Sequence, residues 1–253
     1  FIGNTLSKIS KEKIADEDFI PFLKKLLERE KEEINCLVIA AAGPNNQSFI
    51  KLTNRDLLID SRELRTKLNL KECLLLNDWE AVAQSLSEMN EEYFLPIKRG
   101  APFNDNTLLI GPGTGLGVTL IIKGQIIPTE LGNTFGSTKG MLENFDLGDN
   151  KKFFSLENIL SGPGIEKLYE EKFERKLSSE KIISSALDGN KDELFIIENF
   201  LKTLVSMIND LILSFSCEKV ILGGSILNAL KPILMTKKIL GYFSSEINPK
   251  YAQ

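Results

Sequence analysis

The sequence predicts an α/β protein built from two domains. Two apolar runs, 36–42 and 73–76, flank a charged helical stretch that begins at Ser61, which is typical of parallel strands joined by a helix. A polar, turn-rich stretch at 86–106 interrupts this pattern before a second series of apolar runs begins. We therefore expect a small α/β domain over residues 1–106 and a larger α/β domain over residues 107–253.

The first half predicts one surface helix and two buried parallel strands. Residues 18–30 place phenylalanine and leucine side chains on one helical stripe, so this segment is expected to be an amphipathic helix. The run 36–42 ends at Gly43-Pro44, and the run 73–76 ends at Asn77-Asp78. Short apolar runs that end at such turn residues are typical of buried parallel strands.

The second half predicts adjoining hairpins, a long helix, a strand and a final helix. The short runs 108–111, 118–122 and 126–127 are separated by turn residues, which favours antiparallel pairing. Apolar residues then recur every three or four positions from 194 to 215, as in a helix that supports a whole domain. A strand is expected at 219–222, and Pro232 is expected to kink or restart the helix that begins near Ile226.

Composition indicates a globular protein that acts on a small molecule. The 253 residues are 42% hydrophobic and 26% charged, close to the globular average. The net charge of −4, with both signs interspersed, offers no basic patch for a nucleic acid and no polybasic membrane anchor. No apolar run approaches the roughly 20 residues that span a bilayer. We expect no nucleic-acid partner and no membrane partner.

The chain contains no histidine, which excludes mechanisms that need an imidazole base or an imidazole metal ligand. A proton acceptor is therefore expected to be Asp or Glu. The three cysteines, Cys36, Cys73 and Cys217, are far apart and odd in number. This spacing fits neither a disulfide framework nor a zinc ligand set, and it favours a cytoplasmic protein.

The strongest local signal is Gly111-Pro112-Gly113-Thr114-Gly115-Leu116-Gly117, with four glycines in seven residues. Such a loop can present backbone N–H groups to phosphate oxygens at close range. It matches neither the P-loop nor the dinucleotide signature. A glycine-rich turn with no ligand is the alternative, and the motif alone does not decide between them.

Other candidates lie next to strand ends and turns. Asp78 follows an expected parallel strand, where open α/β sheets bind ligands, but an Asp there also serves as a helix cap. Glu130 and Glu157 lie near glycine turns, where acidic residues are usually solvated. Gly223-Gly224 follows an expected strand and either admits an adenine ring or forms a tight turn.

Taken in order, these segments resemble the bacterial glucokinase family of the actin-like hexokinase superfamily over most of the chain. The resemblance is carried by 40–44, Thr53-Asn54, Leu75-Leu76-Asn77-Asp78, 111–118, 128–132, 160–164 with Leu168-Tyr169, and Ile221-Leu222-Gly223-Gly224. It implies the actin-like ATPase (ribonuclease H-like) α/β fold, with two domains and a ligand cleft between them. It also implies ATP-dependent phosphorylation of the 6-hydroxyl of glucose, with Mg²⁺ and ATP as cofactors and a possible homodimer.

The resemblance implies a role for each candidate residue. Asp78 would be the general base. The sugar hydroxyls would be bound by Asn77, Glu130, Asn133 and Glu157. Gly113, Thr114 and Gly115 would surround the phosphates, and Gly223 and Gly224 would lie beside adenosine.

The sequence departs from the family pattern in two places. Asn133 stands where the family has a histidine, so a different hexose is an alternative substrate. The family's amino-terminal Asp-Gly-Gly-Thr hairpin is not found, and we expect it in roughly 20 to 30 residues upstream of Phe1. A sugar-binding regulator that has lost catalysis is the other alternative. A histidine and cysteine zinc motif, present in a neighbouring family, has no counterpart here, so we expect no structural zinc.

Overall fold

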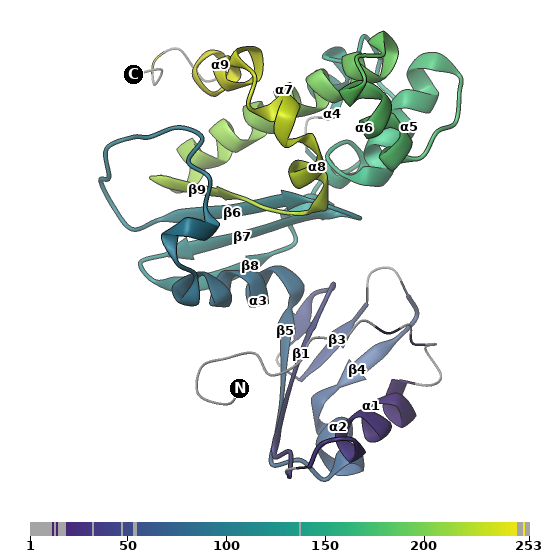
Figure 1. Cartoon of the computed structure of the whole chain (residues 1–253), viewed down its shortest axis with the longest axis vertical. Helices are drawn as coiled ribbons and strands as arrows, with labels where there is room; N and C mark the ends of the chain where they lie inside the picture. Colours follow the sequence, from purple (N-terminus) through teal and green to yellow (C-terminus); the bar gives the residue numbers. More distant parts are fainter. Residues whose placement is uncertain are drawn as a thin grey trace. The chain divides into compact units, whose positions relative to one another are not determined.

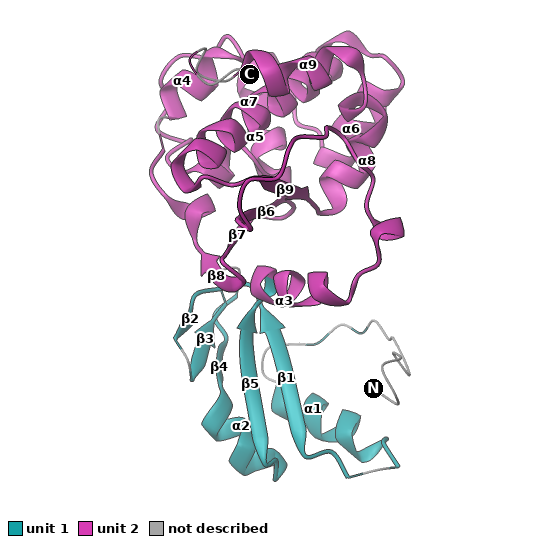
Figure 2. Cartoon of the chain, turned by 90° about the vertical axis from the view of Figure 1, so that its left-hand side faces the viewer, with its two compact units in different colours: residues 1–78 teal, residues 79–253 magenta. Residues whose placement is uncertain are grey.

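The protein consists of two compact units, residues 1–78 and 79–253 (Figure 2). The structure is a computed structural model, and it describes residues 12, 14, 19–31, 33–46, 48–52, 55–136, 138–246 and 250. Two of the expected features lie outside the described residues. They are Thr53-Asn54, which carries part of the family resemblance, and Asp18, the first residue of the expected amino-terminal helix.

The described residues of unit 1 form two small sheets and two helices. Its elements are α1 (Phe19–Glu28), β1 (Cys36–Ala41), β2 (Asn45–Asn46), β3 (Phe49–Lys51), β4 (Leu58–Asp60), α2 (Ser61–Leu68) and β5 (Glu72–Asn77). β1 and β5 are parallel, as expected, with Cys36 opposite Glu72 and Ala41 opposite Asn77. β2, β3 and β4 form an antiparallel sheet that the sequence reasoning missed.

The expectation that β1 and β5 are buried on both faces is wrong for the described residues. Leu37, Ile39 and Leu75 pack into the core of unit 1 with α1 and α2. Val38 and Leu74 point the other way and are 53% and 50% exposed. The strands are therefore apolar on both faces, although only one face is covered within the described part of the chain.

Unit 2 contains a four-stranded sheet and most of the helices. Its elements are α3 (Asp78–Ser85, shared at its first residue with unit 1), η2 (Leu86–Glu88), η3 (Glu91–Tyr93), β6 (Thr107–Pro112), β7 (Leu116–Ile122), β8 (Gln125–Thr129), η4 (Leu131–Asn133), α4 (Thr138–Glu143), η5 (Leu156–Asn158), α5 (Gly162–Phe173), α6 (Ser179–Leu187), α7 (Lys191–Phe215), β9 (Lys219–Leu222), α8 (Ser225–Leu234) and α9 (Lys237–Ser245).

The sheet of unit 2 has the order β8-β7-β6-β9. β6, β7 and β8 are antiparallel hairpins, as expected, and β9 joins β6 in parallel. α3 lies on one face of this sheet, whereas α7 and α8 lie on the other (Figure 1). None of the helices in the described ranges combines the length and the apolar character needed to span a membrane.

The chain divides into the two units between Asp78 and Trp79, earlier in the sequence than the boundary that we expected near Asn106. The intervening residues group with unit 2 for two reasons. Trp79 packs on glycines of β6 and β7. Glu218, just before β9, also accepts hydrogen bonds from two backbone amides of the turn-rich segment.

Three helices of unit 2, α7, α8 and α9, can be compared with the sequence expectations. α7 spans 25 residues and lies at the centre of the unit 2 core, as the apolar periodicity predicted. Pro232 lies inside α8, which ends at Leu234, and α9 starts at Lys237. The helix thus continues through Pro232, and the restart that was expected follows at Met235-Thr236, where Thr236 Oγ1 accepts from Ile239 N–H and caps α9.

A buried tyrosine–glutamate pair joins α5 to α7. Tyr169 is fully buried, and its hydroxyl donates to Glu193 Oε1 at 2.6 Å. Burial, together with the adjacent Glu193 carboxylate, raises the pKa of Tyr169 to about 12. The folded state therefore holds this proton more tightly than the unfolded chain, and the associated stability is lost as pH rises from about 10 to about 12.

Replacing Tyr169 by phenylalanine is expected to lower the free energy of unfolding by about 1 to 3 kcal/mol, because Glu193 loses its buried donor. Denaturant unfolding at pH 7 measures this loss. When the measurement is repeated from pH 9 to pH 12, the free energy of unfolding should fall less steeply with pH in the variant than in the parent. Tyr93→Phe, at a site that is 72% exposed, is the control and should change stability by less than about 0.5 kcal/mol. Equal losses at both sites would contradict the prediction.

Two buried threonines differ in hydrogen bonding. The hydroxyl of Thr119, in β7, has no hydrogen-bond partner among the described residues. Thr203, in α7, donates to Asn199 O at 2.8 Å and accepts from Asn144 Nδ2 at 3.0 Å. Burying an unpaired hydroxyl costs roughly 1 to 3 kcal/mol, so the two sites should respond oppositely to the loss of the hydroxyl.

Thr119→Val is accordingly expected to raise the free energy of unfolding by about 1 kcal/mol, since valine keeps the shape and removes the orphan oxygen. Thr203→Val is the matched change and should lower it by about 1 kcal/mol or more. Chemical denaturation of both variants beside the parent is the measurement. Destabilisation at Thr119 as large as that at Thr203 would refute the argument.

Candidate functional site

The glycine-rich segment forms the tight turn between β6 and β7. Gly113 N–H donates to Gly115 O at 2.8 Å, and Thr114 is exposed at the tip between them. Gly111 pairs with Gly117 across the two strands. The segment is thus a hairpin whose tip is bare of bulky side chains, so an anion can reach its backbone.

Glu157 lies directly against this turn. A Cβ added to Gly115 would lie 2.8 Å from Glu157 Oε2, so no other residue fits there without displacing the carboxylate. Glu157 belongs to η5, and its carbonyl oxygen accepts a hydrogen bond from Ser161 Oγ at 2.6 Å. The structure therefore brings together one acidic candidate and the glycine turn, which are far apart in sequence.

Glu130 and Asn133 lie at the two ends of the η4 turn and bond to each other. Asn133 Nδ2 donates to Glu130 Oε2 at 3.1 Å, and both side chains are exposed. The backbone N–H of Leu156 donates to Thr134 O at 3.3 Å, which joins the η4 segment to the η5 segment. The Glu130–Asn133 pair is therefore held on the segment that adjoins the one carrying Glu157.

The N-terminus of α5 reaches the same turn. Gly162 N–H donates to Gly113 O at 2.8 Å, and the N-cap residue Ser161 accepts from Gly164 N–H at 3.0 Å. No acidic residue lies in the first turn of this helix. Sequence reasoning missed α5 as a helix, although Ser161 followed at once by Gly162-Pro163 is a recognised helix-start signal.

Gly223 and Gly224 connect β9 to α8 beside the same hairpin. Gly223 N–H donates to Ile110 O at 3.0 Å. Gly224 has φ of 96°, and a Cβ there would lie 2.7 Å from Pro112 O. Only glycine combines this backbone conformation with such close approach, so the pair is a tight turn against the hairpin.

Asn77 and Asp78 lie at the end of β5 in unit 1. Asn77 is buried, and its Nδ2 donates to Gly43 O at 3.2 Å, which ties the ends of β1 and β5 together. Asp78 is the first residue of α3 and is half-buried. The strand-end position expected from the sequence is thus confirmed for both residues, while their roles stay predictions.

The candidates fall into two groups. In unit 2 the Gly113–Gly115 turn, Glu157, the Glu130–Asn133 pair and Gly223-Gly224 are linked by packing and backbone hydrogen bonds. In unit 1, Asn77 and Asp78 are neighbours at one strand end. The sequence reasoning missed Trp79, whose indole lies on the glycines of β6 and β7.

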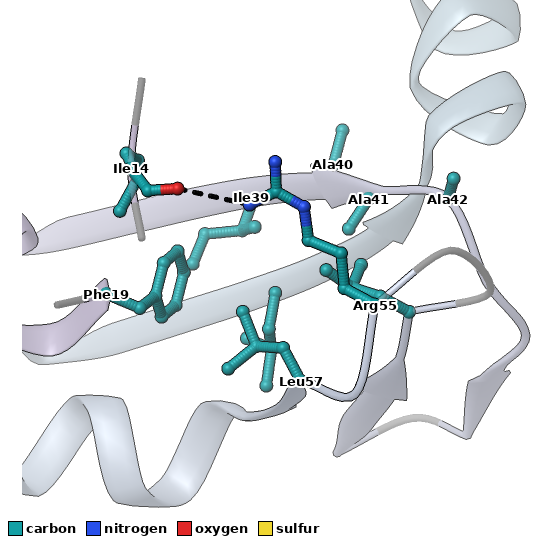
Figure 3. A pocket seen from close by; sticks show the side chains of 10 residues that line it. Ile14, Phe19, Ile39, Ala40, Ala41, Ala42, Arg55 and Leu57 are labelled. Atoms are coloured by element: carbon teal, nitrogen blue, oxygen red, sulfur yellow. Dashed lines mark hydrogen bonds between the residues drawn. The ribbon is translucent and has the colours of Figure 1, made fainter. Parts of the chain in front are cut away.

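A separate cavity of about 310 Å³ lies in unit 1 (Figure 3). Its walls are apolar and include Phe19, Ile39 and Leu57, whereas Arg55 extends along one side, with Nη1 donating to Ile14 O at 3.1 Å. None of the predicted site residues lines it. Apolar walls do not satisfy the hydroxyls of a sugar, so this cavity is not part of the candidate site.

Comparison with known proteins gives the family and the fold. A profile of the glucokinase family matches residues 5–248. The glucokinase of Zymomonas mobilis is 31% identical over 206 residues, which cover 74% of this chain and 63% of that protein. The chain thus spans less than two thirds of the length of this relative.

Solved structures agree with the fold. A glucokinase from an Antarctic psychrotroph has a TM-score of 0.67 at 24% identity, covering 82% of this chain and 69% of that one. The glucokinase of Balamuthia mandrillaris, solved in complex with glucose, has a TM-score of 0.67 at 19% identity, covering 93% and 75%. The α/β fold is that of the actin-like sugar kinases, as expected, and this chain belongs to the glucokinase family.

Proposed function

We propose that this protein is an ATP-dependent hexokinase that transfers the γ-phosphoryl group of ATP to the 6-hydroxyl of glucose. One observation carries the proposal: the Glu157 carboxylate lies against Gly115 of the glycine turn. A carboxylate that can hold a sugar hydroxyl next to a turn that can hold a phosphate is the arrangement that a transfer between them needs.

The acidic side chains and amides suit the acceptor. Sugar hydroxyls both donate and accept hydrogen bonds, so ionised carboxylates and a carboxamide are good partners. Glu157, Glu130 and Asn133 supply these groups within unit 2. Asn77 is proposed to contribute a further amide from unit 1. The Asn133 amide has two N–H donors, and in this structure its Nδ2 donates to Glu130 Oε2.

The glycine turn and α5 suit the phosphates. The N-terminus of a helix favours anions because its dipole is positive there. In α5 this dipole is what would act on a phosphate, since Gly162 N–H donates to Gly113 O, Gly164 N–H donates to Ser161 Oγ, and Pro163 has no N–H. α5 spans 12 residues and bonds to Gly113 through Gly162 N–H. Gly113, Thr114 and Gly115 are proposed to surround the phosphates, with adenosine beside Gly223 and Gly224.

Asp78 is proposed as the base. The sugar 6-oxygen attacks the γ-phosphorus, the bond from that phosphorus to the ADP oxygen breaks, and the hydroxyl proton passes to the Asp78 carboxylate. In a chain without histidine, a carboxylate is the natural acceptor of this proton. The products are ADP and a sugar phosphate.

The described residues do not form a resident metal cage. No group of three or more Asp, Glu and Cys side chains there is arranged to hold a cation. Mg²⁺ commonly binds through substrate phosphates and waters with few protein ligands, so we propose that it enters with ATP. It would neutralise phosphate charge, and no residue of this chain is assigned to it.

The test is a coupled assay of ADP release with the full polypeptide over a panel of hexoses. Glucose-dependent ADP release, with 6-phosphate as the product, is expected. Release with another hexose alone would assign a different substrate. Glucose binding by calorimetry without ADP release from any hexose would overturn the kinase proposal and favour a sugar-binding regulator.

A further inference from the structure

Trp79 is the single tryptophan of the chain, and its indole packs against glycine residues. Trp79 is the second residue of α3, which covers one face of the unit 2 sheet (Figure 1). A Cβ added to Gly111 would overlap Cζ2 and Cη2 of the indole, and one added to Gly117 would overlap Nε1 and Cδ1. Because Gly111 and Gly117 pair across β6 and β7, the ring spans two strands.

The same ring also reaches the β9–α8 turn. A Cβ on Gly223 would lie 3.5 Å from Trp79 Cη2, at ordinary van der Waals distance. Only Pro112 separates Gly111 from the turn at Gly113–Gly115, only Leu116 separates Gly117 from it, and Gly223 directly precedes Gly224. One indole therefore packs on the strands that carry the glycine turn and lies near Gly223 of the second turn that is proposed to bind the nucleotide.

Neither strand glycine is explained by turn geometry. Gly111 and Gly117 lie within β6 and β7 and do not have positive φ. Glycine inside a strand weakens it unless a ring or another backbone approaches closely. The close approach here is the indole, since the three atoms nearest to a Cβ at Gly117 all belong to Trp79.

We infer that Trp79 is a positioning residue for the nucleotide site. Its indole fixes the position of the Gly113–Gly115 turn relative to the Gly223-Gly224 turn. The groups that are proposed to bind the phosphates and the adenosine are thereby held at a constant separation. This inference rests on the proposed function. A shortened side chain leaves a space under both segments, and an enlarged glycine pushes the ring away from them.

The experiment measures ADP and glucose affinities by calorimetry in the full polypeptide. Trp79→Ala and Gly117→Ala are each expected to weaken ADP binding by at least tenfold and to change glucose affinity by less than threefold. Trp79→Phe keeps a flat ring on the glycines and should restore ADP affinity to within about threefold of the parent. The split between the two ligands separates positioning from general damage to the fold.

Two comparisons make the test specific to the ring. Gly241→Ala in α9 is the control, because a Cβ there meets nothing within 4 Å, and ADP affinity should not change. Adding Gly117→Ala to Trp79→Ala should not lower ADP affinity further, since the indole that a Cβ at position 117 would overlap has been removed. If Trp79→Ala does not fold, Gly117→Ala against Gly241→Ala answers the same question.

The outcomes are distinguishable from those of the proposed function. A parent protein that binds no ADP overturns the proposed function and this inference with it. A parent that binds ADP, with Trp79→Ala and Gly117→Ala both within threefold of it, overturns the inference alone. Equal loss of ADP and glucose affinity in these variants also overturns it, because that result indicates a structural role only.

Discussion

Replacing Asp78 by asparagine is expected to lower turnover by ~10²-fold or more, while the protein stays folded and binds sugar nearly as tightly as the parent. Asparagine keeps the size and the hydrogen-bonding shape of the side chain. It removes only the basicity that accepts the hydroxyl proton. Steady-state kinetics and glucose calorimetry on the same preparation are the measurements.

The control is the same change at another helix start of unit 1. Asp60 caps α2, with its Oδ1 accepting from Arg62 N–H at 2.8 Å and from Glu63 N–H at 3.4 Å. These bonds lower the pKa of the Asp60 carboxyl, the bond from Arg62 N–H contributing most. Asp60→Asn should leave turnover unchanged. Turnover of Asp78→Asn within a few-fold of the parent, with sugar binding intact, would remove Asp78 from the catalytic list.

The elements that the sequence predicted well are those with a long or simple apolar pattern. α7 repeats its apolar residues over many turns, and β9 is bounded by polar residues and Gly223-Gly224. β1 and β5 were predicted as parallel strands because each apolar run ends at turn residues and a charged helical stretch lies between them. Such patterns show which side chains of one segment are buried, and the residues of that segment alone are enough to reveal them.

The elements that were missed lack such a pattern. β2, β3 and β4 are two or three residues long, and β2 consists only of asparagines, so no periodicity can appear. Their pairing is set by contacts distant in sequence. The division of the units after Asp78 was also not predictable, because it depends on Trp79 packing against glycines far along the chain.

The site residues were found as motifs, but their grouping needed the structure. Sequence spacing could not show that Glu157 lies on Gly115 or that α5 bonds to Gly113. The role of Trp79 was not visible in the sequence either, because its contacts with Gly111 and Gly117 join segments that are distant in the chain.

Glu157→Gln is expected to weaken glucose binding by roughly tenfold to a hundredfold, because a hydrogen bond to a charged group contributes about 1.5 to 3 kcal/mol. Glutamine keeps the shape beside Gly115 and removes the charge. ADP affinity in the absence of sugar should be unchanged or slightly higher, since a negative charge near the phosphate turn has been removed. Calorimetric titration of each ligand alone measures both affinities.

The direction of the ADP effect separates the two possible roles of Glu157. Its carbonyl oxygen already takes part in the fold by accepting from Ser161 Oγ, but that contact is made by the backbone and survives the substitution. A side chain that only supports the turn would, when altered, weaken ADP and glucose binding alike. Glu143→Gln, on the exposed face of α4, makes the same charge change away from the turn and should alter neither affinity. Selective loss of glucose binding in Glu157→Gln would therefore come from a lost charged contact with the sugar and not from net charge or from a loosened turn.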